Sequence, residues 1–390
     1  MSPWTGPTLQ VHDDHLLTLD QTRLPFEQHW IRLDTLQACE TAIVHMQVRG
    51  APLIGAVAAF GLALALREGL ALSAAMLRLS ATRPTAVNLQ WALARVRARL
   101  ERPSDTHCPA PICTRPQAAA RSERELPMDG SEPVWMIAWR EACRIADEDV
   151  QINASIGMHG LTLLQALIAK RETLQDQAAP GAPLQILTHC NAGRLATVDH
   201  GTALAPIYAA HAAGLAVHVW VDETRPRNQG ASLTAWELMQ AGVPCTVVAD
   251  NAGGWLMQQG RVDAVIVGCD RVAANGDVAN KIGTLLKALA ARDAGLPFWV
   301  ACPTSTLDRC MADGSRIPIE MRSAQEITHA HGQLPDGRRV QVALMQPSVA
   351  ALNPAFDVTP ARLVDALITE QGVIEASPQG IQNLVDHHSR

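Results

Sequence analysis

The sequence predicts an α/β fold with a parallel sheet, and two observations support this prediction. From residue 183 onward, short apolar runs alternate with polar loops and with longer stretches of helical spacing. Residues 51–66 near the N-terminus instead form an uncharged run that is typical of a buried helix. We therefore expect a Rossmann-like parallel-sheet domain over residues 151–390, preceded by a smaller, mainly helical domain over residues 1–150.

Five apolar segments are the candidate strands of this sheet. Their hydrophobicity is nearly unbroken, as expected when helices cover both faces of a sheet. Right-handed crossovers would make the strands parallel, and open sheets of this kind bind ligands at the carboxyl ends of their strands. The candidates are Leu184 to Thr188, Leu215 to Val221, Val243 to Ala249, Val262 to Val267, and Pro297 to Ala301.

Near the N-terminus, Val48-Arg49-Gly50-Ala51-Pro52 opens the predicted helix. Proline suits a first helical turn, and free backbone N–H groups beside an arginine can hold an anion. The uncharged run is short for a membrane span and rich in alanine and glycine, so we expect a core helix. A second arginine, Arg83, precedes another predicted helix. The alternative is that Arg49 or Arg83 makes a surface ion pair.

Two reactive side chains follow candidate strands. Cys190 comes after the first strand and Asp270 after the fourth. Burial raises the pKa of a carboxyl group, which lets Asp270 act as a general acid, and a thiol beside positive charge can supply a thiolate. The alternative is that Cys190 is a small buried hydrophobe and Asp270 a helix N-cap. Neighbours in a strand face opposite sides, so we expect His189 to turn away from the pocket of Cys190.

Two further segments have the composition of ligand-binding loops. The loop from Asp222 to Gly230 combines charged groups with Gln229, and the segment after Asp270 places Asn280 beside Lys281. An amide and an ammonium group suit sugar hydroxyls and a phosphate. These two segments extend the predicted site beyond the thiol and the carboxylate.

Composition narrows the class of protein. The chain has 390 residues, 48% of them hydrophobic, and a net charge of −6, so we expect a small-molecule ligand and neither nucleic acid nor membrane as a partner. The nine cysteines lack paired zinc-ligand spacing, and the two common glycine-rich nucleotide motifs are absent, so we expect neither metal nor cofactor. Without a secretory signal pattern at the start, we expect a cytoplasmic protein. Residues 102–133 indicate a flexible insertion.

The chain resembles the methylthioribose-1-phosphate isomerase family, whose relatives include ribose-1,5-bisphosphate isomerase and the regulatory subunits of the exchange factor for a translation initiation factor. The similar blocks occur in order along nearly the whole chain, which makes the resemblance specific. They are Val48 to Pro52, Arg83 to Leu89, Thr188 to Gly193, Gly201 to Leu204, Glu223 to Glu237, Gly268 to Thr284, Pro303 to Thr306, Ile317 to Glu320, and Asn353 to Pro360.

The resemblance implies an aldose–ketose isomerase of methionine salvage that acts as a homodimer. It implies Cys190 and Asp270 as the catalytic pair, with Asp270 as proton donor. Two positions depart from the family pattern: Ser232 stands where an arginine is usual, and Arg194 stands where we expect a small residue. The substrate contacts implied are Arg49, Gly50, Ala51, Arg83, Gln229, Asn280 and Lys281.

Three alternatives stay open at this point. The first is an isomerase of another pentose 1-phosphate, such as 5-deoxyribose 1-phosphate or ribose 1,5-bisphosphate, and Arg194 would favour a second phosphate. The second is a regulatory subunit without activity, which predicts loss of the thiol and carboxylate. The third is a hydrolase that uses Cys190 as nucleophile, which calls for an oriented histidine partner.

Overall fold

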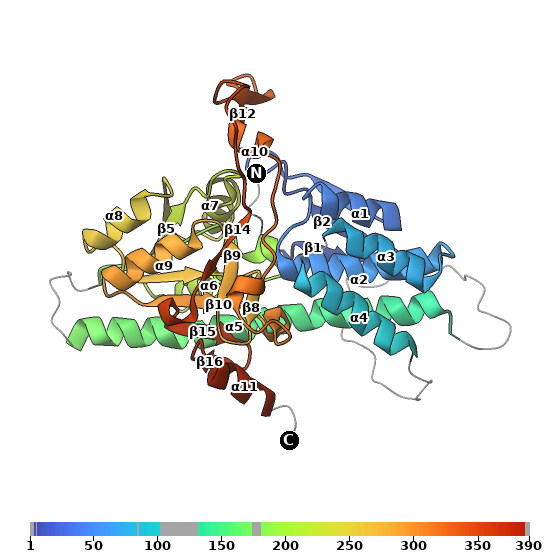
Figure 1. Cartoon of the computed structure of the whole chain (residues 1–390), viewed down its shortest axis with the longest axis horizontal. Helices are drawn as coiled ribbons and strands as arrows, with labels where there is room; N and C mark the ends of the chain where they lie inside the picture. Colours follow the sequence, from blue (N-terminus) through green and yellow to red (C-terminus); the bar gives the residue numbers. More distant parts are fainter. Residues whose placement is uncertain (1–3, 5, 84–85, 102–131, 174–180, 387–390) are drawn as a thin grey trace.

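The computed structural model describes residues 4, 6–83, 86–101, 132–173 and 181–386, and it has a mixed α/β fold (Figure 1). Most of the predicted insertion at 102–133 lies outside the described residues. The described elements comprise a helical N-terminal part, a long connecting helix, and a C-terminal part built on a parallel sheet. The parallel α/β fold predicted for the C-terminal part is confirmed.

The N-terminal part packs around one buried helix, α2 (Ala51–Arg67). Every residue of α2 from Leu53 to Ala65 is buried, which confirms the expected core helix. A small antiparallel sheet in the order β1-β2-β3 was not predicted, because its strands have only three or four residues each. The elements that accompany α2 are β1 (Leu9–Val11), β2 (Leu16–Leu19), β3 (Trp30–Leu33), α1 (Leu36–Val44), α3 (Leu72–Thr82) and α4 (Val87–Glu101).

The helix α5 (Val134–Thr173) runs along both parts of the molecule (Figure 1). Its first half, with Ala142 and Ile145, packs into the N-terminal hydrophobic cluster, and its second half, with Ile156 and Leu164, packs into the cluster of the sheet. By length and composition alone α5 is apolar enough to cross a membrane, and it packs against α2, α4 and α6. The division into domains at residue 150 stays a prediction.

Among the described residues, the main sheet has seven strands in the order β16-β15-β10-β7-β4-β5-β6, and only β16 is antiparallel to its neighbour. The five predicted strands are confirmed, with ends that shift by up to two residues. The strand β15, near the C-terminus, was not predicted. The strands are β4 (Leu184–Thr188), β5 (Val217–Asp222), β6 (Cys245–Val248), β7 (Ala264–Val267), β10 (Phe298–Ala301), β15 (Ala366–Thr369) and β16 (Gly372–Ile374).

Both faces of this sheet are covered, because alternate residues of each strand point to opposite sides. Ile186 and Ile266 belong to one hydrophobic cluster with residues of α5 and α6, whereas Leu187 and Val265 belong to another with residues of α8 and α9. This two-sided burial is the reason for the unbroken apolar strands. The covering helices are α6 (Ala205–Ala212), α7 (Ala235–Gln240), α8 (Ala252–Gln258), α9 (Thr284–Asp293) and α11 (Pro378–Asp386).

A second sheet, in the order β11-β8-β9-β14, lies beside the carboxyl edge of the first, because β8 begins just after β7 ends. A hairpin of β12 and β13 projects from the body together with α10 (Figure 1). Neither the second sheet nor the hairpin was predicted. Their bounds are β8 (Arg271–Ala273), β9 (Val278–Lys281), β11 (Leu307–Asp308), β14 (Phe356–Thr359), β12 (His329–Gln333), β13 (Arg339–Ala343) and α10 (Gln325–Thr328). Short 3₁₀ turns span Arg194–Ala196, Thr304–Thr306, Gly314–Arg316 and Ala361–Leu363, and a π-helical turn spans Gly230–Thr234.

The strand order locates the ligand-binding edge. From β4 the chain continues to β5 and β6 on one side, and from β7 it continues to β10 and β15 on the other. The adjacent strands β4 and β7 therefore form the point where the winding reverses, and open α/β sheets bind ligands at that crevice. Cys190 and Asp270 both stand just past these two strand ends.

We predict that buried Asp149, in the middle of α5, makes stability fall as pH rises. Burial raises its pKa from 3.8 to about 7, against the opposing hydrogen bond from the Val198 N–H at 2.7 Å. The unfolded chain loses this proton near pH 4 and the folded chain near pH 7, so the stability contribution is present below pH 4 and lost through that window. In Asp149→Asn this loss, on the order of 4 kcal/mol by linkage, should disappear.

Denaturant unfolding of both proteins at several pH values between 4 and 8 measures this difference. The free energy of unfolding of Asp149→Asn should exceed that of the unmutated chain increasingly toward pH 8. A constant difference across this range would contradict the prediction.

Candidate active site

The nine predicted site residues line one pocket at the carboxyl edge of the main sheet. They come from both parts of the chain: the start of α2, the end of α3, the loops after β4, β5 and β7, and the end of β9. The structure thus brings together residues separated by more than two hundred positions. They are Arg49, Gly50, Ala51, Arg83, Cys190, Gln229, Asp270, Asn280 and Lys281.

Cys190 is held in an unusual backbone conformation. Its φ of 67° lies in the left-handed region, which is costly for a residue with a side chain and occurs most often at functional sites. Two hydroxyl groups fix it: the Cys190 N–H donates to Thr224 Oγ1 at 2.8 Å, and Thr234 Oγ1 donates to the Cys190 carbonyl at 2.6 Å. The thiol is partly exposed and lines the pocket, so the alternative of a buried hydrophobe does not fit.

Asp270 faces the same pocket from the end of β7. It precedes the strand β8, and its N–H donates to the Ala279 carbonyl at 2.9 Å, so the helix N-cap alternative is wrong. Removal from bulk water raises the pKa of its carboxyl group, and the cations Lys281 and Arg83 oppose that effect. The carboxyl group can therefore keep a proton at higher pH than an exposed aspartate, as a general acid requires.

The start of α2 offers an anion-binding corner. Gly50 precedes the helix with a φ of 87°, and a Cβ at this position would collide with the backbone of Ala196. An α-helix leaves the N–H groups of its first turn without helical partners, so the Ala51 and Leu53 N–H groups can face a ligand, whereas Pro52 has no N–H. Arg49 stands beside them, half-buried, and its buried Nε lacks a partner within the protein. Burial lowers the pKa of Arg49, and its guanidinium stays charged.

Lys281 and Arg83 bring positive charge to the other side of the pocket. Lys281 Nζ donates to the Ala355 carbonyl at 2.8 Å and lies over the ring of Phe356, and burial lowers its pKa to about 8. Arg83 Nη2 lies 3.4 Å from Glu320 Oε2, an ion pair that is only partly exposed. These cations can bind an anionic substrate group while they moderate the pKa of Asp270.

Two amide side chains complete the predicted set. Gln229 is buried at the end of the loop after β5, and its Oε1 has no partner within the protein, so it can accept a bond from a substrate hydroxyl. Asn280 Nδ2 donates to Thr284 Oγ1 at 3.0 Å, which leaves its carbonyl oxygen for other partners. Sequence reasoning did not single out Arg322 and Phe356 as pocket residues. Phe356 lies in the similar block Asn353 to Pro360, which was a signal for it, whereas Arg322 lies outside the similar blocks.

The two positions that depart from the family pattern lie outside the pocket lining. Arg194 lies over the ring of Tyr208, and its Nε is 3.5 Å from Asp199 Oδ1. Ser232 lies within the π-helical turn Gly230–Thr234. Arg194 therefore does not bring a cation to the substrate side, and the hypothesis that it binds a second phosphate loses its support.

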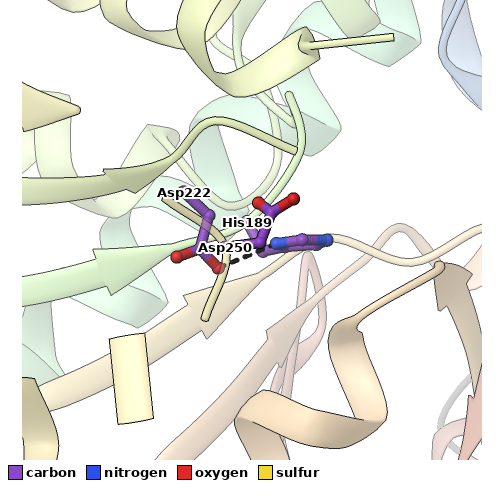
Figure 2. A group of neighbouring side chains, drawn as sticks. All are labelled: His189, Asp222 and Asp250. Carbon is purple, nitrogen blue, oxygen red and sulfur yellow. Dashed lines mark hydrogen bonds and ion pairs between the residues drawn. The ribbon is translucent and has the colours of Figure 1, made fainter. Parts of the chain in front are cut away.

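His189, the residue before Cys190, forms a cluster of metal-ligand type with Asp222 and Asp250 (Figure 2). Protein atoms already hold the histidine: Nδ1 is 2.8 Å from Asp222 Oδ2, and Nε2 is 2.8 Å from the Ile282 carbonyl. Each ring nitrogen therefore already has a protein oxygen at hydrogen-bond distance. His189 therefore has no nitrogen left for Cys190, but it lines the same pocket, so the expectation that it turns away from that pocket is not confirmed.

A lysine supplies the positive charge of this cluster. Lys287 Nζ is 3.1 Å from Asp222 Oδ2 and also donates to the Asp250 carbonyl. The carboxylate oxygens of Asp250 each accept a backbone N–H, from Thr224 and Arg225, at 2.7 Å. A metal ion would have to displace the ammonium group, so we interpret the cluster as a structural network of charges.

Comparisons with known proteins agree with this architecture. The model of the initiation factor 2 subunit family matches residues 47–376. Methylthioribose-1-phosphate isomerases from Dechloromonas aromatica and Methylorubrum extorquens are 53% and 51% identical, cover 98% of this chain, and are themselves covered to 97% and 96%.

Solved structures are also similar to this chain over nearly its whole length. The 5-methylthioribose 1-phosphate isomerase from Pyrococcus horikoshii OT3 has a TM-score of 0.76 and 35% identity, with 99% of this chain and 98% of that chain covered. The translation initiation factor eIF-2B, subunit delta, from A. fulgidus has a TM-score of 0.73 and 34% identity, with coverages of 97% and 100%.

We predict that Lys287→Met destabilises the fold and that no metal contributes to it. The variant leaves the buried Asp222 carboxylate without its lysine partner, and breaking a buried ion pair typically costs about 3–5 kcal/mol. The exposed Lys170→Met serves as the matched control, with an expected change within about 0.5 kcal/mol. Denaturant unfolding measures both.

A chelator such as EDTA should leave the unfolding midpoint of the unmutated chain unchanged. A lowered midpoint, restored by added zinc, would contradict the assignment of Lys287 as the resident positive charge.

Proposed function

This chain belongs to the initiation factor 2 subunit family, and we propose that it is an aldose–ketose isomerase converting 5-methylthioribose 1-phosphate to 5-methylthioribulose 1-phosphate in methionine salvage. The observation that carries the proposal is the full-length similarity to enzymes named methylthioribose-1-phosphate isomerase. The pocket supports it, because a thiol, a carboxyl group of raised pKa and several cations line one cavity.

Ring opening is the step in which we assign Asp270 a role. The phosphate ester blocks the anomeric carbon of this substrate, so the ring cannot open as that of a free sugar does. A protonated Asp270 donates its proton to the ring oxygen as the bond to C1 breaks. Burial, which raises the pKa of this carboxyl group, makes it a suitable donor.

Hydrogen then moves from C2 to C1, and Cys190 is the group we assign to this step. In one route the Cys190 thiolate takes the proton from C2 and returns it to C1 through an enolate-like species, and the C2 hydroxyl proton passes to the ionised Asp270. In the other, hydrogen moves directly as a hydride, and Cys190 removes the proton of the C2 hydroxyl. Both routes use a thiol that reaches into the pocket, and the fixed backbone of Cys190 supports such a role.

The anion-binding corner at the start of α2 is the site we assign to the phosphate. Arg49 provides charge there, and the backbone N–H groups of Gly50 and Ala51 provide donors. Arg83, Gln229, Asn280 and Lys281 then surround the sugar. Apolar side chains, including Met46, Ile54 and Ile317, line other parts of the pocket and suit a thioether better than a second phosphate.

The alternatives have less support. The bisphosphate alternative relied on Arg194, which contacts Tyr208 and Asp199. A thiol hydrolase needs an oriented histidine, and both nitrogens of His189 are engaged. A regulatory subunit without activity predicts loss of Cys190 or Asp270, and both are present.

The wider context is also part of the proposal. We expect a cytoplasmic enzyme with domains at 1–150 and 151–390, which enclose the substrate between them. We further expect a homodimer, because α8 and α9 pack on each other and leave Trp255, Leu286 and Leu289 exposed. No nucleic-acid or membrane partner is proposed.

The direct test is conversion of 5-methylthioribose 1-phosphate to the ketose phosphate by the purified chain. Cys190→Ser and Asp270→Asn should each lower kcat by about 10²–10⁴-fold, since each removes one positioned acid–base group. The exposed Cys310→Ser and Asp293→Asn serve as matched controls and should keep full activity. No turnover by the unmutated chain would overturn the proposed function.

A further inference from the structure

Glu237, on α7, is a buried carboxylate that the proposed reaction does not use. Only 1% of its side chain is exposed. Within the described ranges it makes no ion pair, and its Oε2 lacks a hydrogen-bond partner. Burial accordingly raises its pKa to about 7, against the opposing hydrogen bond from Asn191. A buried carboxylate without an ion-pair partner lowers the stability of the fold, so the contacts of Glu237 can indicate its role.

The contacts of Glu237 lead to the pocket through Asn191. Asn191 Nδ2 donates one hydrogen to Glu237 Oε1 and the other to Thr234 Oγ1 at 3.0 Å. Thr234 gives its own hydrogen to the Cys190 carbonyl, so toward Asn191 its oxygen can only accept. Two acceptors therefore fix which end of the Asn191 amide faces them.

The fixed amide in turn orients Arg49. With its NH₂ group held by Glu237 and Thr234, Asn191 must present Oδ1 to the other side, where it accepts from Arg49 Nη2. The Asn191 backbone carbonyl accepts from Nη1 of the same guanidinium at 3.2 Å. The edge of the guanidinium that carries Nη1 and Nη2 is thus held by two oxygen atoms of Asn191. Nε, which has no partner within the protein, is free for a ligand.

The chain is also shaped to admit this carboxylate. A Cβ at Gly193 would collide with the carboxylate of Glu237, so the loop that carries Cys190 and Asn191 passes directly over it. This close contact between the loop and Glu237 is possible because Gly193 has no side chain. Glu237 therefore touches the same loop at two points, by a hydrogen bond to Asn191 and by close packing on Gly193.

We propose that Glu237 is a positioning residue for the anion-binding site: through Asn191 it sets the orientation in which Arg49 binds the phosphate of the substrate. The inference rests on the proposed function for the identity of the substrate. It concerns Arg49 and the phosphate, so it predicts an effect on binding more than on the chemical step.

The test compares Glu237→Ala with Glu237→Gln. In Glu237→Ala the Asn191 amide loses one acceptor and can turn its NH₂ group toward Arg49, so KM should rise about tenfold or more while kcat changes less. Glu237→Gln keeps an acceptor oxygen of the same shape and should restore KM to near the unmutated value. Glu141→Gln, at a buried carboxylate that pairs with Arg95 and Arg144, is the matched control. It should lose stability with KM unchanged.

Binding of inorganic phosphate, measured by calorimetry, separates this inference from the proposed function. Phosphate should bind Glu237→Ala about tenfold or more weakly than the unmutated chain or Glu237→Gln, whether or not the sugar phosphate is converted. If Glu237→Ala does not fold, Asn191→Ala removes the same link and should show the same weakening. Unchanged phosphate affinity in the folded Ala variants, or a Gln variant as weak as the Ala variant, would overturn the proposal.

Discussion

The reversal of strand order between β4 and β7 is the constraint on which the site depends. The two strands are neighbours, but the chain leaves them toward opposite edges of the sheet. Their following loops diverge, and a crevice opens between them at the carboxyl edge. Cys190 and Asp270 occupy the two sides of that crevice. The anion-binding groups come from elsewhere, Arg49 from the start of α2 and Lys281 from the second sheet.

Two buried carboxylates hold the loop of Cys190 from both sides. The residue before it, His189, bonds to Asp222 at the end of β5, and the residue after it, Asn191, bonds to Glu237 on α7. Cys190 lies between these anchors with a left-handed backbone. Such a conformation persists only where its surroundings determine it more strongly than local preference does. The buried charges cost desolvation, and in return they hold the loop in one geometry.

Regular segments were predictable because their pattern depends on neighbours in the chain. The strand Leu184–Thr188 has the predicted bounds, and the helix Ala51–Arg67 is buried as its uncharged sequence indicates. Short strands such as β1 and β8 were not predicted, because three residues carry too little periodicity. The N-cap alternative for Asp270 failed for a related reason: the chain after it enters the three-residue strand β8, which pairs with the following strand β9 and with the more distant β11.

The sequence by itself determined the chemical groups of the site and their places at strand ends and helix starts, since these follow from apolar patterning and local turn chemistry. Only the tertiary structure decided which of them share a pocket. Arg194 and Arg49 are both arginines beside glycines, yet one faces Asp199 and the other lines the pocket. The roles of Glu237 and Lys287 could not be recognised from the sequence either. Their partners lie 46 and 65 positions away, at Asn191 and Asp222, and strand order alone brings them together.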